Sequence, residues 1–166
     1  PAVGTPRPVG QAIVENLFPN NDNGRIPIVG VSGSYGKTAV SYLIAKLLIL
    51  SGKRTGLASS NGLYLDYRQI DKNDNANWVA ANRTLMNPIV ETAVFENSFD
   101  AILNEGLAYD SCQVGVITNI DTSCHTGRND IETTKQIFTV LRTQIDVVTP
   151  TAAALDDIEK DISLPT

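Results

Sequence analysis

The chain has 166 residues, a length typical of a single domain. Hydrophobic residues make up 42% of it, which is enough to fill a core and excludes an intrinsically disordered tail. There are 13 basic and 18 acidic residues, and the net charge of −5 disfavours binding to a nucleic-acid backbone or an anionic membrane surface. Two cysteines are too few for a disulfide framework, so a reducing, cytoplasmic location is the simplest interpretation.

No targeting segment can be recognised in the sequence. Its longest apolar run, Ala39 to Leu50, is shorter than the ~20 residues that a membrane-spanning helix needs. The first residue is Pro1 rather than Met, and we therefore expect the chain to be a piece of a longer protein. We expect residues 1–24 to be a connecting segment with a short helix, and residues 25–166 to form one domain.

Hydrophobic spacing predicts the elements of this domain. Val9, Ile13 and Leu17 recur at helical intervals, and a turn-forming stretch follows at residues 19–24. Short apolar runs predict strands at 25–32, 53–59, 91–96 and 114–118. Helical patterns occupy 37–48, 78–86, 100–107 and 130–145. We expect 63–65 to extend a hairpin, the polar stretch 66–77 to be a surface loop, and 152–155 to form a last strand.

The order of these elements predicts the fold class. Short apolar strands alternate with helices, which is typical of an α/β protein with a mainly parallel sheet covered by helices on both faces. We therefore expect a three-layer, P-loop-containing fold. In such sheets, ligands bind at the carboxyl ends of the strands.

The most informative stretch is Gly30-Val31-Ser32-Gly33-Ser34-Tyr35-Gly36-Lys37-Thr38, where a buried strand leads into a glycine-rich turn and a helix follows. Glycines permit backbone angles that point successive N–H groups at one anion, and a helix N-terminus adds its positive end. Lys37 would act as the catalytic cation on the outer phosphates, and the Thr38 hydroxyl would reach Mg²⁺. The residues predicted to bind the nucleotide are Gly33, Ser34, Tyr35, Gly36, Lys37 and Thr38.

The spacing of the glycines departs from the strict Walker pattern. That pattern places a glycine where this chain has Val31, and the glycines here give GxxGxxGKT instead. The alternative is a loop that only turns a strand into a helix and leaves Lys37 in solvent. An unrelated P-loop kinase or nucleotide switch is disfavoured, because its glycine spacing would be of the Walker type.

The loop resembles the ATP loop of the Mur ligase superfamily, which commonly reads G-x-T-G-T-N-G-K-T-T. Over most of its length, the chain is most similar to the central ATPase domain of the cyanophycin synthetases. The similarity includes the segments Gly52-Lys53-Arg54-Thr55-Gly56, Ala93-Val94-Phe95-Glu96 and the run from Tyr109 to Ile120. It implies that residues 25–166 are a Mur ligase-like central ATP-binding domain.

The resemblance implies the central domain of an ATP-dependent amide-bond ligase that uses ATP and Mg²⁺. Such enzymes phosphorylate a carboxylate, and an amine displaces phosphate from the acyl phosphate. The implied substrates are an amino acid or a poly-amino acid, namely arginine and poly-aspartate in a cyanophycin synthetase-like enzyme. The implied partners are flanking domains of the same chain, and a homo-oligomer is compatible with the sequence. Neither nucleic acid nor a membrane is an expected partner.

Family positions also imply a metal site and one further nucleotide contact. Glu96 matches the acidic metal ligand, and it can face the loop across the sheet edge. His125 matches a histidine that helps to hold magnesium, and Asn119 matches an asparagine near the nucleotide. Thr38, Glu96 and His125 are thus the predicted metal ligands. The alternative interpretations are a solvated or helix-capping Glu96 and a structural His125.

Several family positions are changed in this chain, mostly by loss of charge. The replacements are Tyr35, Ala39, Ala80-Ala81-Asn82, Phe99, Asn104, Cys124 and Leu141. Loss of cationic partners from a dry site costs several kcal/mol of transition-state stabilisation unless another group replaces them. The sequence therefore leaves two hypotheses open. One is a ligase domain that has changed its substrate, and the other is a degenerate domain with a structural role, which binds nucleotide weakly or not at all.

Overall fold

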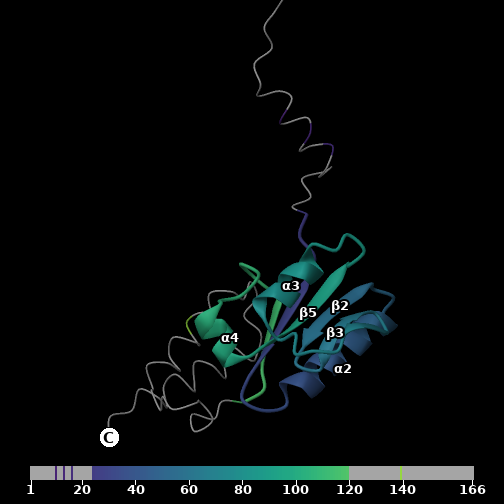
Figure 1. Cartoon of the computed structure of the whole chain (residues 1–166). Helices are drawn as coiled ribbons and strands as arrows, with labels where there is room; N and C mark the ends of the chain where they lie inside the picture. Colours follow the sequence, from purple (N-terminus) through teal and green to yellow (C-terminus); the bar gives the residue numbers. More distant parts are fainter. Residues whose placement is uncertain (1–9, 11–12, 14–15, 17–23, 120–138, 140–166) are drawn as a thin grey trace, which may run out of the picture.

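The structure is a computed structural model that describes residues 10, 13, 16, 24–119 and 139. The described part forms one mixed sheet with helices on both of its sides (Figure 1). Its strands are β1 (Ile28–Ser32), β2 (Thr55–Ser59), β3 (Gly62–Leu65), β4 (Arg68–Asp71), β5 (Thr92–Asn97) and β6 (Val114–Ile117). Its helices are α2 (Lys37–Leu50), α3 (Trp78–Leu85) and α4 (Phe99–Asn104).

The strands are ordered β4-β3-β2-β5-β1-β6 across the sheet. Four of them, β2, β5, β1 and β6, run parallel, whereas β3 and β4 are antiparallel additions at one side. All four parallel strands therefore end at the same edge of the sheet, which is where α/β proteins bind ligands. The chain enters α2 at this carboxyl edge, directly after β1.

Alternation along β5 separates two hydrophobic layers. Ala93 and Phe95 pack with residues of α3 on one face, and Val94 packs with residues of α2 on the other. Because successive side chains of a strand point to opposite faces, Glu96 lies on the same face as Val94. The buried strand thus aims a carboxylate toward the side of the sheet that carries α2.

A short hairpin, β3–β4, is attached to α2 by aromatic contacts. The Lys46 Nζ of α2 lies 5.2 Å from the ring centroid of Tyr42 and 4.4 Å from that of Tyr67. Tyr42 also meets Tyr64 of β3 edge to face, with ring centroids 5.9 Å apart. Such cation–π and aromatic contacts contribute about 0.5–1.5 kcal/mol each.

The predicted α/β class, with a mainly parallel sheet and helices on both faces, is confirmed. The prediction of a loop over the whole of 66–77 is wrong, because Arg68–Asp71 forms β4 by pairing with β3. Helix α4 is also shorter than predicted. It ends at Asn104, and Gly106 (φ +76°) closes it through hydrogen bonds to the carbonyls of Ala101 and Ile102.

Other predicted elements lie wholly or mostly outside the described residues. These are the turn at 19–24, the helix from Asp130 and the strand at 152–155. Of the first predicted helix, the structure describes Gly10, Ile13 and Asn16, which are helical. The division of the chain at residue 24 stays a prediction.

Candidate functional site

The glycine turn between β1 and α2 forms the centre of the carboxyl edge. Gly33 has φ +140° and Gly36 has φ +78°, so both use backbone conformations that favour glycine. Gly36 caps α2 without a side-chain hydrogen bond. Within the described residues, the N–H groups of Lys37 and Thr38 have no acceptor, as expected in the first turn of a helix. These amides are available to an anion.

The end of β6 holds the turn in place. The Asn119 carbonyl oxygen accepts from the Ser34 N–H at 2.9 Å, and its Oδ1 accepts from the Tyr35 N–H at 2.9 Å. Thr118 Oγ1 donates to the Tyr35 carbonyl oxygen at 2.6 Å. A Cβ on Gly33 would lie 2.1 Å from Thr118 Oγ1, so only glycine permits this approach. The structure therefore brings Asn119 to the loop backbone, and its contact with a nucleotide stays a prediction.

Lys37 is the basic side chain nearest to the turn in sequence. Its Nζ lies 3.4 Å from the carbonyl oxygen of Ser34 and thus folds back over the loop. In the part of the chain that the structure describes, Lys37 has no ion pair with a carboxylate. Its charge is therefore not neutralised by an acidic side chain there, as a phosphate ligand would require.

Thr38 and Glu96 meet beside the start of α2. The Thr38 Oγ1 donates to Glu96 Oε1 at 2.9 Å, although the two residues are 58 positions apart. Glu96 is only 4% exposed. A third group, Ser60 in the turn after β2, donates its N–H to Glu96 Oε2 at 3.0 Å. The predicted pair of Thr38 and Glu96 is thus one cluster of oxygen atoms, and Ser60 is a member that the sequence did not indicate.

The chemistry of this cluster fits a hard divalent cation. Glu96 is a buried carboxylate that forms no ion pair with any described lysine or arginine. A buried charge is costly unless a counter-charge accompanies it. The described residues contain no group of three or more His, Cys, Asp or Glu that could hold a metal. One carboxylate and one hydroxyl suit Mg²⁺, which is usually bound by few protein oxygens together with water and substrate phosphates.

The structure places some of the changed family positions, and others it does not describe. Phe99, where the family resemblance implies an arginine, is 6% exposed and packs with Ile102. Tyr35, which belongs to the loop, is 58% exposed. The remaining predicted metal ligand, His125, lies outside the described residues, as do Cys124 and Leu141.

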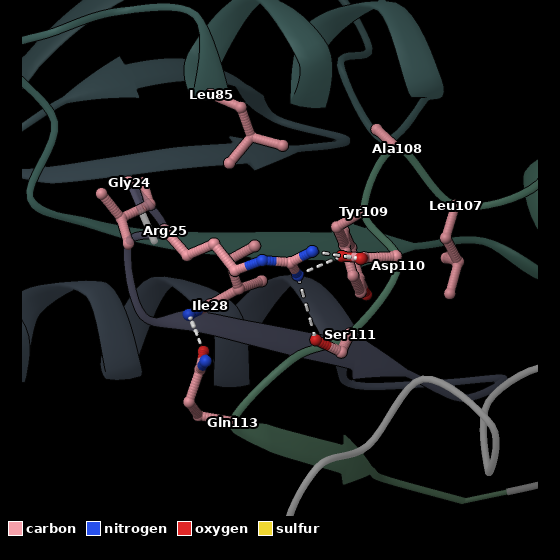
Figure 2. Close-up of a pocket in the computed structure, with 11 residues that line it drawn as sticks. Gly24, Arg25, Ile28, Leu85, Leu107, Ala108, Tyr109, Asp110, Ser111 and Gln113 are labelled. Carbon is pink, nitrogen blue, oxygen red and sulfur yellow. Dashed lines mark hydrogen bonds and ion pairs between the residues drawn. The ribbon is translucent and has the colours of Figure 1, made fainter. Parts of the chain in front are cut away.

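A hollow in the described part lies at the opposite, amino edge of the sheet. It has a volume of about 630 Å³ and lies between the chain entering β1 and the chain entering β6 (Figure 2). The Arg25 guanidinium binds both carboxylate oxygens of Asp110 there, at 2.5 Å each. Burial, and to a lesser extent the nearby Cys112, raises the pKa of the Tyr109 hydroxyl, so this group stays neutral. The hollow contains none of the predicted site residues.

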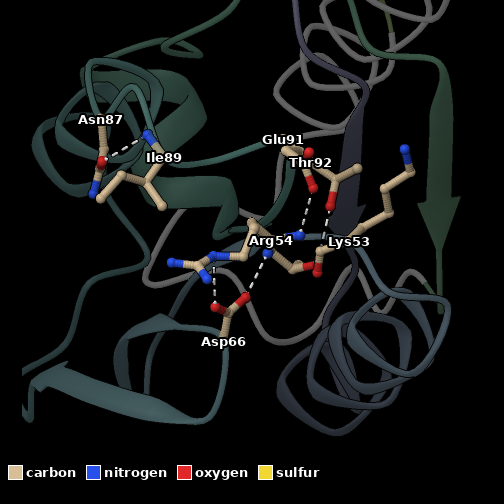
Figure 3. Close-up of polar contacts among 8 residues, drawn as sticks. Lys53, Arg54, Asp66, Asn87, Ile89, Glu91 and Thr92 are labelled. Atoms are coloured by element: carbon tan, nitrogen blue, oxygen red, sulfur yellow. Dashed lines mark hydrogen bonds and ion pairs between the residues drawn. The ribbon is translucent and has the colours of Figure 1, made fainter.

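Further along the same amino edge, the residues preceding β2 and β5 are joined by polar contacts (Figure 3). Arg54 Nε lies 3.2 Å from Asp66 Oδ2, and Glu91 Oε2 accepts from the Arg54 N–H at 2.9 Å. Asp66 Oδ1 also accepts from the Thr55 N–H at 2.8 Å. These groups are paired with one another, and we assign them a structural role.

Comparison with known proteins places this geometry in a family. The sequence profile of the Mur ligase middle domain matches residues 31–154. The chain belongs to the Mur ligase middle-domain family. This Mur ligase middle domain is related to ATP-dependent ligases, and its predicted resemblance to them and to the cyanophycin synthetases is confirmed.

Cyanophycin synthetase of Geminocystis herdmanii is 41% identical to this Mur ligase middle domain over 140 residues, which are 84% of this chain and 16% of that protein. Cyanophycin synthetase of Synechocystis sp. is 37% identical over 155 residues, which are 93% and 18%. The chain thus spans less than a fifth of the length of these curated relatives.

A solved structure of UDP-N-acetylmuramoyl-L-alanyl-D-glutamate–2,6-diaminopimelate ligase superposes with a TM-score of 0.57 at 18% identity. The match covers 77% of this chain and 27% of that one, and it shows a shared fold. No described helix of the chain is long and apolar enough to cross a bilayer.

Proposed function

We propose that this domain binds ATP and Mg²⁺ for an ATP-dependent amide-bond ligase similar to cyanophycin synthetase. The observation that carries the proposal is the contact of 2.9 Å between the Thr38 hydroxyl and the buried Glu96 carboxylate, beside the glycine turn. Backbone N–H groups, one lysine and a pair of hard oxygen ligands then lie at one sheet edge. This set matches what a triphosphate with its magnesium ion requires.

The residues of the chain divide the work by their chemistry. The N–H groups of Lys37 and Thr38 would bind phosphate oxygens, and the Lys37 ammonium would neutralise charge on the outer phosphates. Thr38 and Glu96 would hold Mg²⁺, and His125 stays a proposed third ligand. When bound, the metal supplies neutralisation of the charge that develops during phosphoryl transfer.

For the whole protein we propose the reaction of an ATP-dependent ligase, in keeping with its relatives. A substrate carboxylate attacks the γ-phosphorus of ATP, ADP leaves, and an amine then displaces phosphate from the acyl phosphate to form an amide. We propose arginine and poly-aspartate as substrates, because the curated relatives are named cyanophycin synthetase. Flanking domains of the same chain would supply the remaining groups, and the need for cellular ATP favours a cytoplasmic location.

A second candidate is a degenerate domain with a structural role. It is favoured by the burial of Phe99 in the core, at a position where the family resemblance implies an arginine. In this alternative, the fold persists and nucleotide binding is weak or absent.

Calorimetric titration with ATP and Mg²⁺ separates the two candidates. We expect the wild-type chain to bind, and Lys37→Ala to weaken binding by about 100-fold, because one charge-assisted contact to phosphate is worth several times RT. Lys53→Ala is the matched control, because Lys53 is an exposed lysine at the amino edge. Circular dichroism checks the fold of each variant.

Absence of binding by a folded wild-type chain would favour the degenerate domain. Equal loss of affinity in Lys37→Ala and Lys53→Ala would contradict a specific role for Lys37. Arginine- and aspartate-dependent release of phosphate by the longer protein would then test the reaction itself.

A further inference from the structure

Ser60 contacts both groups proposed to hold Mg²⁺, the Thr38 hydroxyl and the Glu96 carboxylate. In sequence it is adjacent to neither the glycine turn nor β5. It lies in the turn that connects β2 (Thr55–Ser59) to β3 (Gly62–Leu65). This turn lies at the carboxyl end of β2, which is separated from β1 only by β5 in the sheet. The topology therefore brings the turn to the edge where α2 begins.

The contacts of Ser60 are directed at Glu96 and Thr38. Its N–H donates to Glu96 Oε2 at 3.0 Å, and its Oγ lies 3.2 Å from each carboxylate oxygen. The same Oγ lies 2.9 Å from Thr38 Oγ1, where either hydroxyl can be the donor. Thr38 in turn donates to Glu96 Oε1 at 2.9 Å. Three residues from distant parts of the chain thus share one ring of hydrogen bonds.

The number of protons in this ring has a consequence for metal binding. Thr38 has one hydroxyl proton, and in the absence of metal the best acceptor for it is the charged Glu96 carboxylate. For both groups to bind a metal, a lone pair of the Thr38 oxygen and one of Glu96 Oε1 must point at the same ion. The hydrogen bond from the Thr38 hydroxyl to Glu96 Oε1 must therefore break, and the hydroxyl must turn to another acceptor. The Ser60 Oγ, 2.9 Å away, is a second acceptor for the Thr38 proton.

Ser60 also keeps Glu96 in place during such a change. Its N–H holds Oε2, the oxygen that does not contact Thr38, so the carboxylate stays oriented when Oε1 is released. Groups that hold metal ligands in position commonly contribute 10- to 100-fold to metal affinity. A serine that only stabilised its own turn would need none of these contacts.

We infer that Ser60 is a positioning residue for Mg²⁺ in this domain. Its hydroxyl oxygen accepts a hydrogen bond from the Thr38 hydroxyl, and its N–H holds the Glu96 carboxylate in orientation. The inference rests on the proposed function, because it concerns the metal that accompanies ATP. The backbone N–H is present in every variant, so substitutions at position 60 test the hydroxyl alone.

The experiment measures ATP affinity by calorimetry, once with Mg²⁺ and once with EDTA. We expect Ser60→Ala to reduce the gain in affinity that Mg²⁺ provides by about tenfold, and to leave the affinity in EDTA unchanged. Ser60→Thr keeps a hydroxyl and should restore the gain. Ser59→Ala is the matched control, since the Ser59 hydroxyl donates to the Gly62 carbonyl oxygen across the same hairpin and is not hydrogen-bonded to Glu96 or Thr38.

The outcomes distinguish the two levels of the argument. If the wild-type chain binds ATP with a metal-dependent gain and Ser60→Ala keeps that gain, the inference about Ser60 is wrong and the proposed function stands. The inference is also wrong if Ser60→Ala weakens binding equally with and without Mg²⁺, or if Ser59→Ala loses as much of the gain. A folded wild-type chain that does not bind ATP contradicts the proposed function and the inference together.

Discussion

At the amino edge of the sheet Arg25 binds Asp110 and Arg54 binds Asp66, whereas at the carboxyl edge Lys37 and Glu96 have no such partner among the described residues. Both edges contain charged side chains next to strand ends. They differ in how those charges are satisfied. The amino edge pairs cation with anion, and the carboxyl edge surrounds each charge with neutral carbonyl, hydroxyl and N–H groups.

This difference teaches which edge is built for a charged ligand. Exposed ion pairs such as those at the amino edge contribute about 1 kcal/mol or less to stability, and their paired charges leave little net charge to attract a ligand. A buried carboxylate that is contacted only by neutral donors lacks a counter-charge, and so its site favours an incoming cation. We therefore look for nucleotide and magnesium at the carboxyl edge, although the hollow beside Arg25 and Asp110 is at the other.

The largest expected effect on stability comes from a substitution in the glycine turn between β1 and α2. Gly33→Ala should lower the free energy of unfolding by about 3 kcal/mol, because φ is +140° and the new Cβ would lie 2.1 Å from Thr118 Oγ1 and 2.9 Å from the Asn119 carbonyl oxygen. Urea denaturation measures this change. Gly52→Ala is the matched control, with φ +87° and open space around the Cβ, and should lose only about 1 kcal/mol. Equal losses would show that the loop is not held by β6.

The next effect separates charge from stability. Glu96→Gln should abolish most of the gain in ATP affinity that Mg²⁺ provides, about tenfold or more, because an amide is a weaker ligand for a hard cation than a carboxylate. Its free energy of unfolding should change by less than about 1 kcal/mol, since the hydroxyls of Thr38 and Ser60 can turn to accept from the new amide group.

Asp66→Asn provides the contrast for that variant at the amino edge. It keeps the shape and the positive φ of 53°, but it removes the charge that pairs with Arg54. We expect it to lower stability by up to about 1 kcal/mol and to leave ATP binding unchanged. Comparison of the two variants by thermal unfolding and calorimetry tests the contrast directly. The proposed difference between the two edges would be wrong if Glu96→Gln lost stability and kept the gain in ATP affinity from Mg²⁺.

The smallest effect concerns pH at the amino edge. The hydrogen bond from Arg25 holds the pKa of the Asp110 carboxyl below its ordinary value of 3.8. A lowered pKa means that the pair stabilises the fold above pH 3.8 and that this contribution is lost as the pH falls through the lowered pKa. In Arg25→Gln, an NMR titration should show the Asp110 pKa moving back toward 3.8. An unchanged titration would mean that the pair does not persist in solution.

Much of the fold follows from the sequence because its central strands are buried on both faces. The runs from Ala93 to Phe95 and from Ile28 to Val31 are short and apolar, which suffices to predict buried parallel strands. In contrast, Arg68–Asp71 has no alternation of apolar and polar residues. This segment becomes a strand because the preceding turn allows it to pair with β3. Its local sequence therefore could not predict the strand.

The candidate site divides in a similar way. The glycine turn, Lys37 and Thr38 form a contiguous pattern whose chemistry can be predicted, and Glu96 follows from the family resemblance. Ser60 could not be found, because a single serine carries no pattern and its partners are 22 and 36 residues away in the chain. Only the strand order, with β5 between β1 and β2, brings the three together. The binding roles of Lys37, Thr38 and Glu96 stay predictions, and the positioning role of Ser60 is a proposal from the structure.

The contact between Lys46 and Tyr67 has a mechanical consequence for this edge. Lys46 lies in the helix whose first turn supplies Thr38, and Tyr67 follows the strand that leads away from Ser60. Helix α2 and the β3–β4 hairpin, which carry Thr38 and follow Ser60, are thus joined by a contact outside the oxygen cluster. A cation arriving there would meet a preorganised frame, and little conformational entropy would be lost on its capture.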